Sequence, residues 1–283
     1  MKIKLCPSKL DSSFKIDLKA LFQDLDRIRQ TNPVIHNITN LVVMPITANL
    51  LLALGASPLM AHAEEELTEI LHLSHALVLN IGTLDEHWVS AMTKAQKIAL
   101  DFKTPVVLDP VGAGASHYRT RTAKKILERG VTLVRGNASE IMALLDPTIK
   151  TKGVDSTQAS HDALEAAKLI AEKYKCAVVV SGKTDFIVTK NQHAMLDFGT
   201  PLFTKVVGMG CSLTAIIASF LTVNPDPFLA SNHAMALFGM AGELAAKKAQ
   251  GPGSFYTQLL DTLYSLKQTD LEPFASKSPL ALC

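Results

Sequence analysis

The sequence is poor in cysteine and shows no strong excess of one charge. Its four cysteines, Cys6, Cys176, Cys211 and Cys283, are scattered, with no Cys-x-x-Cys pair and no His-rich partner. This spacing argues against a zinc site. The net charge is only +2, and basic and acidic residues are interspersed. A nucleic-acid-binding surface needs clustered Lys and Arg, so we expect no nucleic-acid partner.

Long hydrophobic runs are also missing. The first 25 residues hold no continuous apolar segment of the kind that a signal peptide needs. The uncharged segment 206–225 begins with Gly208, Gly210 and small polar residues. Its apolar part is about half of the roughly 20 residues that a membrane-spanning helix requires, so we expect a buried helix and no membrane association. Together with the scattered cysteines, these features predict a cytoplasmic protein with free thiols.

What the chain does contain is an alternation of short apolar runs and helical patterns. Expected strands are 57–60, 76–81, 105–108, 132–134, 177–180 and 186–189, most of them bounded by Gly, Pro or Asn. Expected helices are 64–73, 86–99, 120–129, 138–145, 212–221, 227–248 and 253–266. The alternation implies parallel pairing. We therefore expect an α/β fold with a central, mostly parallel sheet flanked by helices on both faces.

The expected organisation is one domain over residues 31–283, preceded by an N-terminal extension and helix over residues 1–30. The helix is amphipathic, because apolar residues recur at helical spacing. These residues are Leu18, Leu21, Phe22, Leu25 and Ile28. Ligands of an open parallel sheet bind beyond the carboxyl ends of its strands, so the residues just after each strand are the candidates for function.

Acidic and basic side chains follow two of the expected strands. Asp109 comes directly after strand 105–108 and is followed by glycines that let backbone approach a ligand. The same pattern also suits a simple turn that begins with an acid. Arg135 follows strand 132–134, where a guanidinium can hold phosphate. Asn137 and Glu140 form the pattern of a helix-capping box, although Glu140 could also face a metal-bound phosphate.

Two further motifs lie in loops. The segment 181–185, Ser-Gly-Lys-Thr-Asp, resembles the end of a phosphate-binding loop. It lacks the upstream glycine and precedes no helix, so we interpret it as a hairpin turn. The segment 36–40, His-Asn-Ile-Thr-Asn, leads into a helix with Pro45 near its start and Gly55 at its end. We expect Asn37, Thr39 and Asn40 in a loop near the entrance to a pocket for a small heteroaromatic ring.

The most informative motif is the segment 208–211, Gly-Met-Gly-Cys, in front of an apolar helix. Glycines at a helix start expose backbone N–H groups, which with the helix dipole can hold the charge of a transferring phosphoryl group. Cys211 would lie in the first turn, where a helix N-terminus can lower the pKa of a thiol and prepare it to accept a proton from an alcohol. The alternative is a small apolar Cys packed under a glycine turn.

Taken in order, these segments resemble the hydroxyethylthiazole kinases, thiamine-salvage enzymes of the ribokinase-like superfamily. The similarity covers roughly residues 31–265. The matching segments are 36–40, 42–44, 54–58, 80–83, 109–112, 135–140 and 208–211. The resemblance implies a ribokinase-like kinase domain that phosphorylates the hydroxyl of 4-methyl-5-(2-hydroxyethyl)thiazole with ATP and Mg²⁺. It also implies a homotrimer with active sites at the subunit interfaces.

The resemblance further implies a role for each matching residue. Cys211 would stand at the catalytic-base position and Gly210 in the anion hole. Met44 and Gly208 would contact the thiazole, and we add Asn37 to this substrate group. Arg135 and Ser181 would contact ATP, whereas Asp109 and Glu140 would face Mg²⁺ through water or phosphate.

Two departures from the family pattern affect this reading. Val207 replaces a common Thr, and Met209 is larger than the usual residue between the glycines. We expect lower activity or a shifted substrate preference. Two alternatives therefore stay open: a kinase of another vitamin-precursor alcohol, such as pyridoxal or hydroxymethylpyrimidine, and a non-catalytic thiazole-binding protein. Cys rather than Asp after Gly210 favours the thiazole branch.

Overall fold

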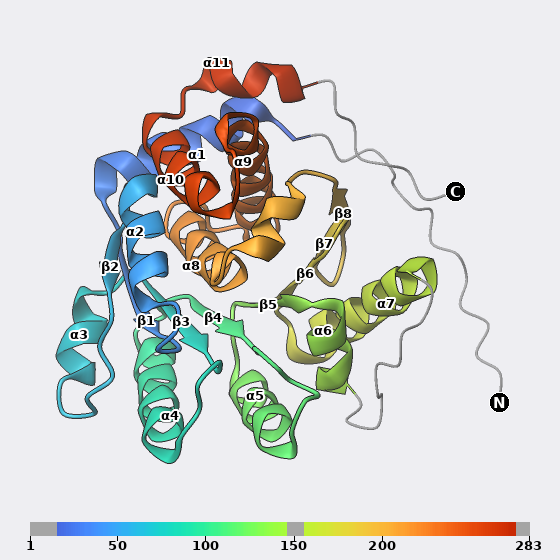
Figure 1. Cartoon of the computed structure of the whole chain (residues 1–283). Coiled ribbons are helices and arrows are strands. Elements are labelled where there is room, and N and C mark those ends of the chain that lie inside the picture. The colour runs from blue at the N-terminus through green and yellow to red at the C-terminus, as the bar shows by residue number, and fades with distance from the viewer. Residues whose placement is uncertain (1–15, 146–155, 276–283) are drawn as a thin grey trace.

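A computed structural model describes residues 16–145 and 156–275. The strands of this part form one eight-stranded sheet in the order β2-β1-β3-β4-β5-β6-β7-β8 (Figure 1). Pairing is parallel from β2 through β6 and antiparallel from β6 through β8. The strands are β1 (Val34–Ile38), β2 (Ser57–Leu59), β3 (Ala76–Asn80), β4 (Val106–Asp109), β5 (Leu133–Asn137), β6 (Ala177–Ser181), β7 (Asp185–Val188) and β8 (His193–Leu196). The predicted α/β fold with a mostly parallel sheet is confirmed.

Helices cover both faces of the sheet (Figure 1). One face carries α1 (Leu18–Thr31), α2 (Met44–Leu54), α8 (Met209–Leu221), α9 (Pro227–Lys248) and α10 (Pro252–Ser265). The other carries α3 (Leu67–Leu73), α4 (Glu86–Asp101), α5 (His117–Arg129), α6 (Ala138–Leu145) and α7 (Ser156–Tyr174). The short helices are α11 (Gln268–Leu271), η1 (Pro201–Lys205) and η2 (Glu272–Phe274).

The apolar strands bury side chains in both helical layers. In β3, Ala76 and Val78 join the core under α8, whereas Leu77 and Leu79 join the core under α4. This two-sided burial explains why the strand has a continuous apolar run. α8 is almost wholly buried, as expected for segment 206–225, and no helix in the described part of the chain is long and apolar enough to cross a bilayer.

Several elements were not predicted. The sequence places Asn37, Thr39 and Asn40 in a loop, and this is wrong for Asn37, whereas Thr39 and Asn40 do lie in the loop after β1. Asn37 lies inside β1 opposite Val78, and all three side chains are buried. The helix α7 and the edge strand β8 were also missed. The free state predicted for the thiols is confirmed for Cys176 and Cys211, while Cys6 and Cys283 lie outside the described residues.

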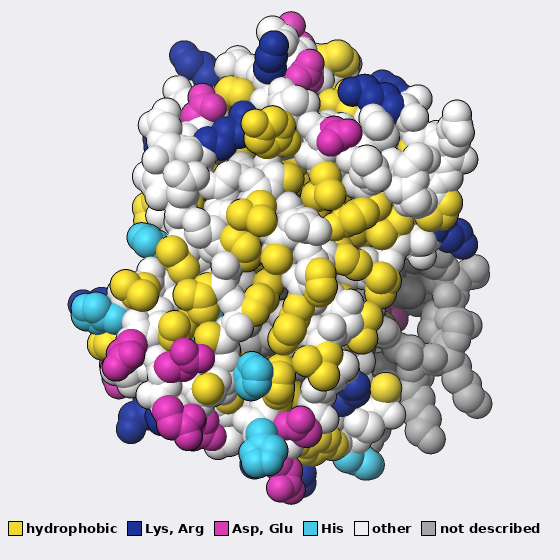
Figure 2. Space-filling model, turned by 60° about the vertical axis from the view of Figure 1, so that its left-hand side comes forward, with side chains coloured by type: hydrophobic (Ala, Val, Ile, Leu, Met, Phe, Trp, Pro, Cys, Tyr) yellow, Lys and Arg dark blue, Asp and Glu magenta, His cyan; other side chains and the backbone are white. Residues whose placement is uncertain are grey.

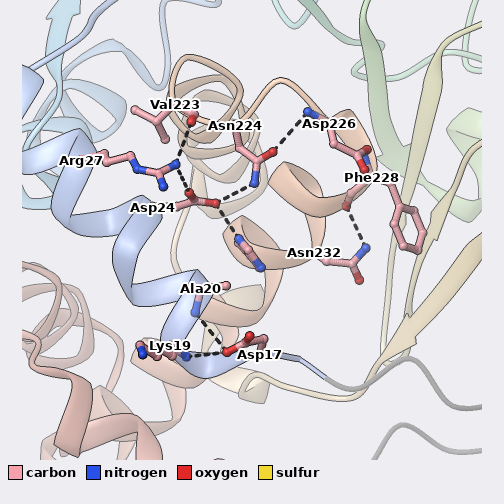
Figure 3. A network of polar contacts seen from close by, with 11 residues as sticks. Asp17, Lys19, Ala20, Asp24, Arg27, Val223, Asn224, Asp226, Phe228 and Asn232 are labelled. Atoms are coloured by element: carbon pink, nitrogen blue, oxygen red, sulfur yellow. Dashed lines mark hydrogen bonds and ion pairs between the residues drawn. The ribbon is translucent and has the colours of Figure 1, made fainter.

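A polar network fixes α1 to the helical layer (Figure 3). The buried carboxylate of Asp24 accepts hydrogen bonds at 2.8 Å from Asn224 Nδ2 and at 3.2 Å from Arg27 Nη1. Its Oδ2 also lies 2.7 Å from Nδ1 of the buried His233 on α9. Since Leu21 and Leu25 pack into the same core, the predicted amphipathic helix is an integral part of this layer.

We expect Asp24→Ala to destabilise the fold by about 3 kcal/mol, because it leaves buried polar groups on Asn224 and His233 without their acceptor. Urea unfolding followed by circular dichroism measures this loss. Gln23→Ala, an exposed position of the same helix, is the control and should stay within about 0.5 kcal/mol of the parent. A similar small effect of both substitutions would contradict the anchoring role.

Candidate active site

Polar side chains meet where the central strands end. Asn40 follows β1, Asn80 ends β3 and Asp109 ends β4. Asn40 Nδ2 donates to Asn80 Oδ1 at 2.8 Å, and Asn80 Nδ2 donates to Asp109 Oδ2 at 2.8 Å. Thr214 Oγ1 of α8 donates to the same carboxylate oxygen at 2.9 Å. This ladder holds the Asp109 carboxylate in one orientation at the carboxyl edge of the sheet.

The surroundings of Asp109 make the ionised form of its carboxyl group unfavourable. Burial raises its pKa from 3.8 to about 6, and the negative charge of Glu140 adds to the rise. Arg135 and the two hydrogen bonds from Asn80 and Thr214 oppose it. The side chain is 1% exposed. A buried acid of this kind, at the end of a strand and within reach of an arginine charge, is typical of a functional site.

The helix α8 begins with an exposed set of backbone amides. It starts at Met209, three residues before the predicted start, and Gly208 is its N-cap with a left-handed φ of 82°. A Cβ at Gly208 would come within 3.0 Å of Val43 Cγ1, so only glycine suits this close turn. Ser212 N–H bonds to Gly208 O, whereas the first-turn N–H groups before it have no acceptor inside the helix. They form an amide cradle that favours an anion.

Arg135 lies directly against this cradle. A Cβ added to Gly210 would come within 2.8 Å of Arg135 Nη1, so the guanidinium occupies the space that a side chain would take. Arg135 Nη2 donates to Ser181 Oγ, while its buried Nε has no hydrogen-bond partner in the structure. The structure thus brings Arg135, Ser181 and Gly210 together, with a positive charge beside the amides.

Cys211 lies in the first turn of α8, as predicted, but its thiol is not activated. Asn40 Nδ2 lies 3.6 Å from Cys211 Sγ. Burial, and after it the negative charge of Asp109, raise the pKa of the thiol to about 11, although Asn80, Arg135 and Asn40 oppose the rise. The expected lowering of this pKa is therefore wrong, because burial disfavours the thiolate.

Glu140 makes the capping box that its spacing predicts. Its Oε2 accepts from Asn137 N–H and its Oε1 from Gly112 N–H, both at 2.9 Å, while Asn137 Oδ1 accepts from Glu140 N–H at 3.0 Å. The side chain therefore ties the β4–α5 loop to the start of α6. Its charge also reaches Asp109.

The predicted substrate residues separate into two places. Met44 begins α2 and is half-buried, next to Val43, which touches Gly208. Asn37 lies below the surface, where its Nδ2 donates to Ile35 O at 2.7 Å and its buried Oδ1 has no partner in the structure.

A cavity of about 710 Å³ opens beside the cradle. Arg135, Ser181 and Gly210 line it together with the apolar side chains of Phe198, Met235 and Phe238. On α9, a Cβ at Gly239 would come within 2.6 Å of Phe198 Cβ, so the bare helix surface lets the segment after β8 approach closely. The volume suits a ligand of nucleotide size.

Sequence reasoning missed Asn80, Thr214 and the apolar wall of this cavity. Asn80 could have been found, because it ends a predicted strand next to the strand that ends at Asp109. Thr214 could not, because a helical pattern does not reveal which strand end a polar side chain of the helix reaches. Phe198 could not, because it follows β8, which was not predicted.

We expect Asp109→Asn to stabilise the ligand-free protein at neutral pH by up to about 3 kcal/mol. The folded-state pKa lies above 3.8, so the parent loses stability as the pH rises from 3.8 to about 6, and the neutral amide does not. Asn Oδ1 can still accept from Asn80 and Thr214. Urea unfolding without divalent cations should show the two proteins converging below pH 3.8. A less stable variant at neutral pH would contradict the buried charge.

Comparison with known proteins places this chain in a family. The model of the "Hydroxyethylthiazole kinase family" matches residues 25–269. A hydroxyethylthiazole kinase of Leptospira biflexa is 49% identical over 250 residues, which covers 88% of this chain and 94% of that protein. The structure of a hydroxyethylthiazole kinase from Pyrococcus horikoshii OT3 has a TM-score of 0.83 at 42% identity and covers 89% of this chain and 96% of that one. A ribokinase-like protein from Enterococcus faecalis shares the fold, with a TM-score of 0.65 at 14% identity, 93% of this chain and 100% of that chain covered. The chain belongs to the hydroxyethylthiazole kinase family.

Proposed function

We propose that this enzyme transfers the terminal phosphoryl group of ATP to the hydroxyl of 4-methyl-5-(2-hydroxyethyl)thiazole. The observation that carries the proposal is the amide cradle of α8 with Arg135 against Gly210 and Cys211 in the same turn. Phosphoryl transfer depends mainly on positioning and charge stabilisation, and this arrangement offers both.

ATP would occupy the cavity of about 710 Å³ with its phosphates toward the cradle. Arg135 and Ser181 would contact the phosphates, because they lie at the cradle and line the cavity. Phe198 and Phe238 would offer apolar surface to the base. In the transfer, the alcohol oxygen bonds to the terminal phosphorus while the bond from that phosphorus to the ADP oxygen breaks. The amides of Met209, Gly210 and Cys211 would face the equatorial oxygens of the moving group.

Asp109 and Glu140 fit a Mg²⁺ ion that is held mostly by water and phosphate. Mg²⁺ retains several waters and takes one or two carboxylates together with substrate phosphates. The charge of Glu140 raises the pKa of Asp109 and the charge of Arg135 lowers it, so the three groups lie near one another. Both carboxylate oxygens of Glu140 already accept backbone hydrogen bonds. Bound there, the ion would neutralise charge on the phosphates.

Cys211 would accept the proton of the alcohol at its Sγ. Because the pKa of the thiol is about 11, only a small thiolate fraction exists at neutral pH. In a loose transition state the alcohol loses its proton late. The small thiolate fraction of Cys211 is therefore enough for the reaction, but it limits the rate. Met44 and Gly208 would hold the thiazole ring on the α2 side of the cradle, whereas the side chain of Asn37 is buried inside β1.

We also infer a homotrimer in which the substrate side of the site lies at a subunit interface. Exposed hydrophobic residues gather around α2 and the start of α8, and Figure 2 shows apolar side chains crowded on this face. They are Leu41, Val42, Leu52 and Val207, each more than half exposed. An exposed apolar patch of this kind is typical of an interaction surface. The mass of the protein in solution, measured by light scattering, tests the assembly.

Steady-state assays with ATP, Mg²⁺ and the thiazole alcohol test the reaction. We expect ADP and thiazole phosphate in equal amounts, with kcat/KM for this alcohol higher than for pyridoxal or hydroxymethylpyrimidine. Well-folded protein that forms no ADP with any of the three alcohols would reject the kinase function. Tight thiazole binding without ADP would point to the non-catalytic alternative.

The proton-acceptor role of Cys211 predicts a pH dependence. Since the active form is the thiolate, kcat of the parent should rise with pH from about pH 6 to about pH 9, approaching tenfold per unit. Cys211→Ala should lower kcat by about 10²- to 10⁴-fold, leave KM little changed and flatten this slope. Cys176→Ala, a buried thiol away from the site, is the matched control and should keep the parent profile. An unchanged kcat in Cys211→Ala would reject the role.

Gly210→Ala should lower the activity of the enzyme without lowering its stability. The added methyl group would displace the Arg135 guanidinium, whose far end can move without unfolding the protein. We expect kcat/KM for ATP to fall about tenfold to hundredfold, with little change in thermal midpoint. At Gly253 a Cβ would meet nothing within 4 Å, so Gly253→Ala is the control. Equal activity of both variants would contradict the contact between Arg135 and the cradle.

A further inference from the structure

Two carboxylates line the cavity in addition to the groups already used. Asp185 begins β7, and Asp197 directly follows β8. β7 and β8 pair antiparallel with Asp185 opposite Leu196, which brings the two acids to the same end of the hairpin. Gly182 N–H donates to Asp185 Oδ1 at 2.9 Å, and the side chain of Asp197 lies at the exposed surface of the cavity.

A continuous path of contacts places these acids along the cavity wall. From the cradle, Gly210 meets Arg135, and Arg135 bonds to Ser181. Gly182, the next residue, bonds to Asp185, and the charge of Asp197 acts on Asp185.

At the far end, Asp197 is joined to Phe198, which packs on Gly239 of α9. The carboxylates therefore line the same cavity as Arg135 and Phe198 and belong to the segments that connect these two residues. In a bound nucleotide the sugar joins the phosphates to the base, so these acids are the candidates for contact with the sugar.

Acids in this place are unfavourable unless the ligand supplies donors there. Burial raises the pKa of Asp185 to about 7, and the charge of Asp197 contributes to the rise. A polyphosphate would be repelled by both groups. In its ionised form each carboxyl group can only accept hydrogen bonds, so a ligand group that favours this form is a donor. In the middle of a ribonucleoside triphosphate the donors are the 2′- and 3′-hydroxyls.

We propose that Asp197 and Asp185 accept hydrogen bonds from the ribose hydroxyls and make the enzyme selective for ribonucleotide over deoxyribonucleotide donors. The inference rests on the proposed function, in that ATP binds this cavity. Hydrogen bonds from neutral hydroxyls to carboxylates are strong enough to distinguish ligands that differ by one hydroxyl, because the deoxy ligand leaves the acid unpaired.

The test compares ATP, 2′-deoxyATP and 3′-deoxyATP as phosphoryl donors. For the parent we expect kcat/KM to fall about tenfold to hundredfold with at least one deoxy donor, mainly through KM. Asp197→Asn and Asp185→Asn should each lower kcat/KM for ATP. In these variants the ratio of kcat/KM for ATP to kcat/KM for the deoxy donor should fall to about threefold or less. Asp261→Asn, an exposed acid on α10, is the control and should keep the parent ratios.

The outcomes separate this inference from the proposed function. Equal kcat/KM for ATP and both deoxy donors in the parent would overturn ribose recognition while leaving the kinase function intact. Binding of a non-hydrolysable ATP analogue, measured by calorimetry, must be present; without it the nucleotide site itself is rejected. ITP adds a further check, because a variant that changes the ATP-to-ITP ratio and not the deoxy ratio would assign Asp197 to the base amino group and overturn the proposal.

Discussion

The arrangement of the site depends on the close approach of Arg135 to a helix residue that has no side chain. The guanidinium comes from the middle of β5 and the amides from the first turn of α8, two elements on different parts of the chain. Only a bare Cα at Gly210 lets the charge lie beside the N–H groups. Because amides and guanidinium face the same space, their attraction for a phosphate adds up in one place.

The buried acid of the site shows a balance between stability and chemistry. Asp109 accepts from Asn80 and Thr214, yet burial still raises its pKa to about 6. The ladder therefore fixes the carboxylate in position without removing the cost of its charge. Such a charge is useful only when a cation or a phosphate-bound metal shares the space, which agrees with the role proposed for Asp109.

The sequence predicted the layers well and the site in part. Continuous apolar runs such as that of β3, and caps such as Asn137 with Glu140, are local signals, and the structure matches them. β1 was not predicted, because its buried His36 and Asn37 break the apolar pattern. The thiol of Cys211 was misjudged for a similar reason: the helix start is visible in the sequence, but the burial that governs the pKa is not.

The glycine at position 239 bears on how this site could change. On α9 the missing Cβ lets the chain after β8 lie on the helix, and that chain carries Phe198 at the apolar end of the cavity. Any side chain at 239 would lift this segment and move Phe198 with it. In the proposed nucleotide site, the depth available to the base would thus depend on one absent methyl group, so a single substitution at 239 would alter which bases fit without changing the phosphate end.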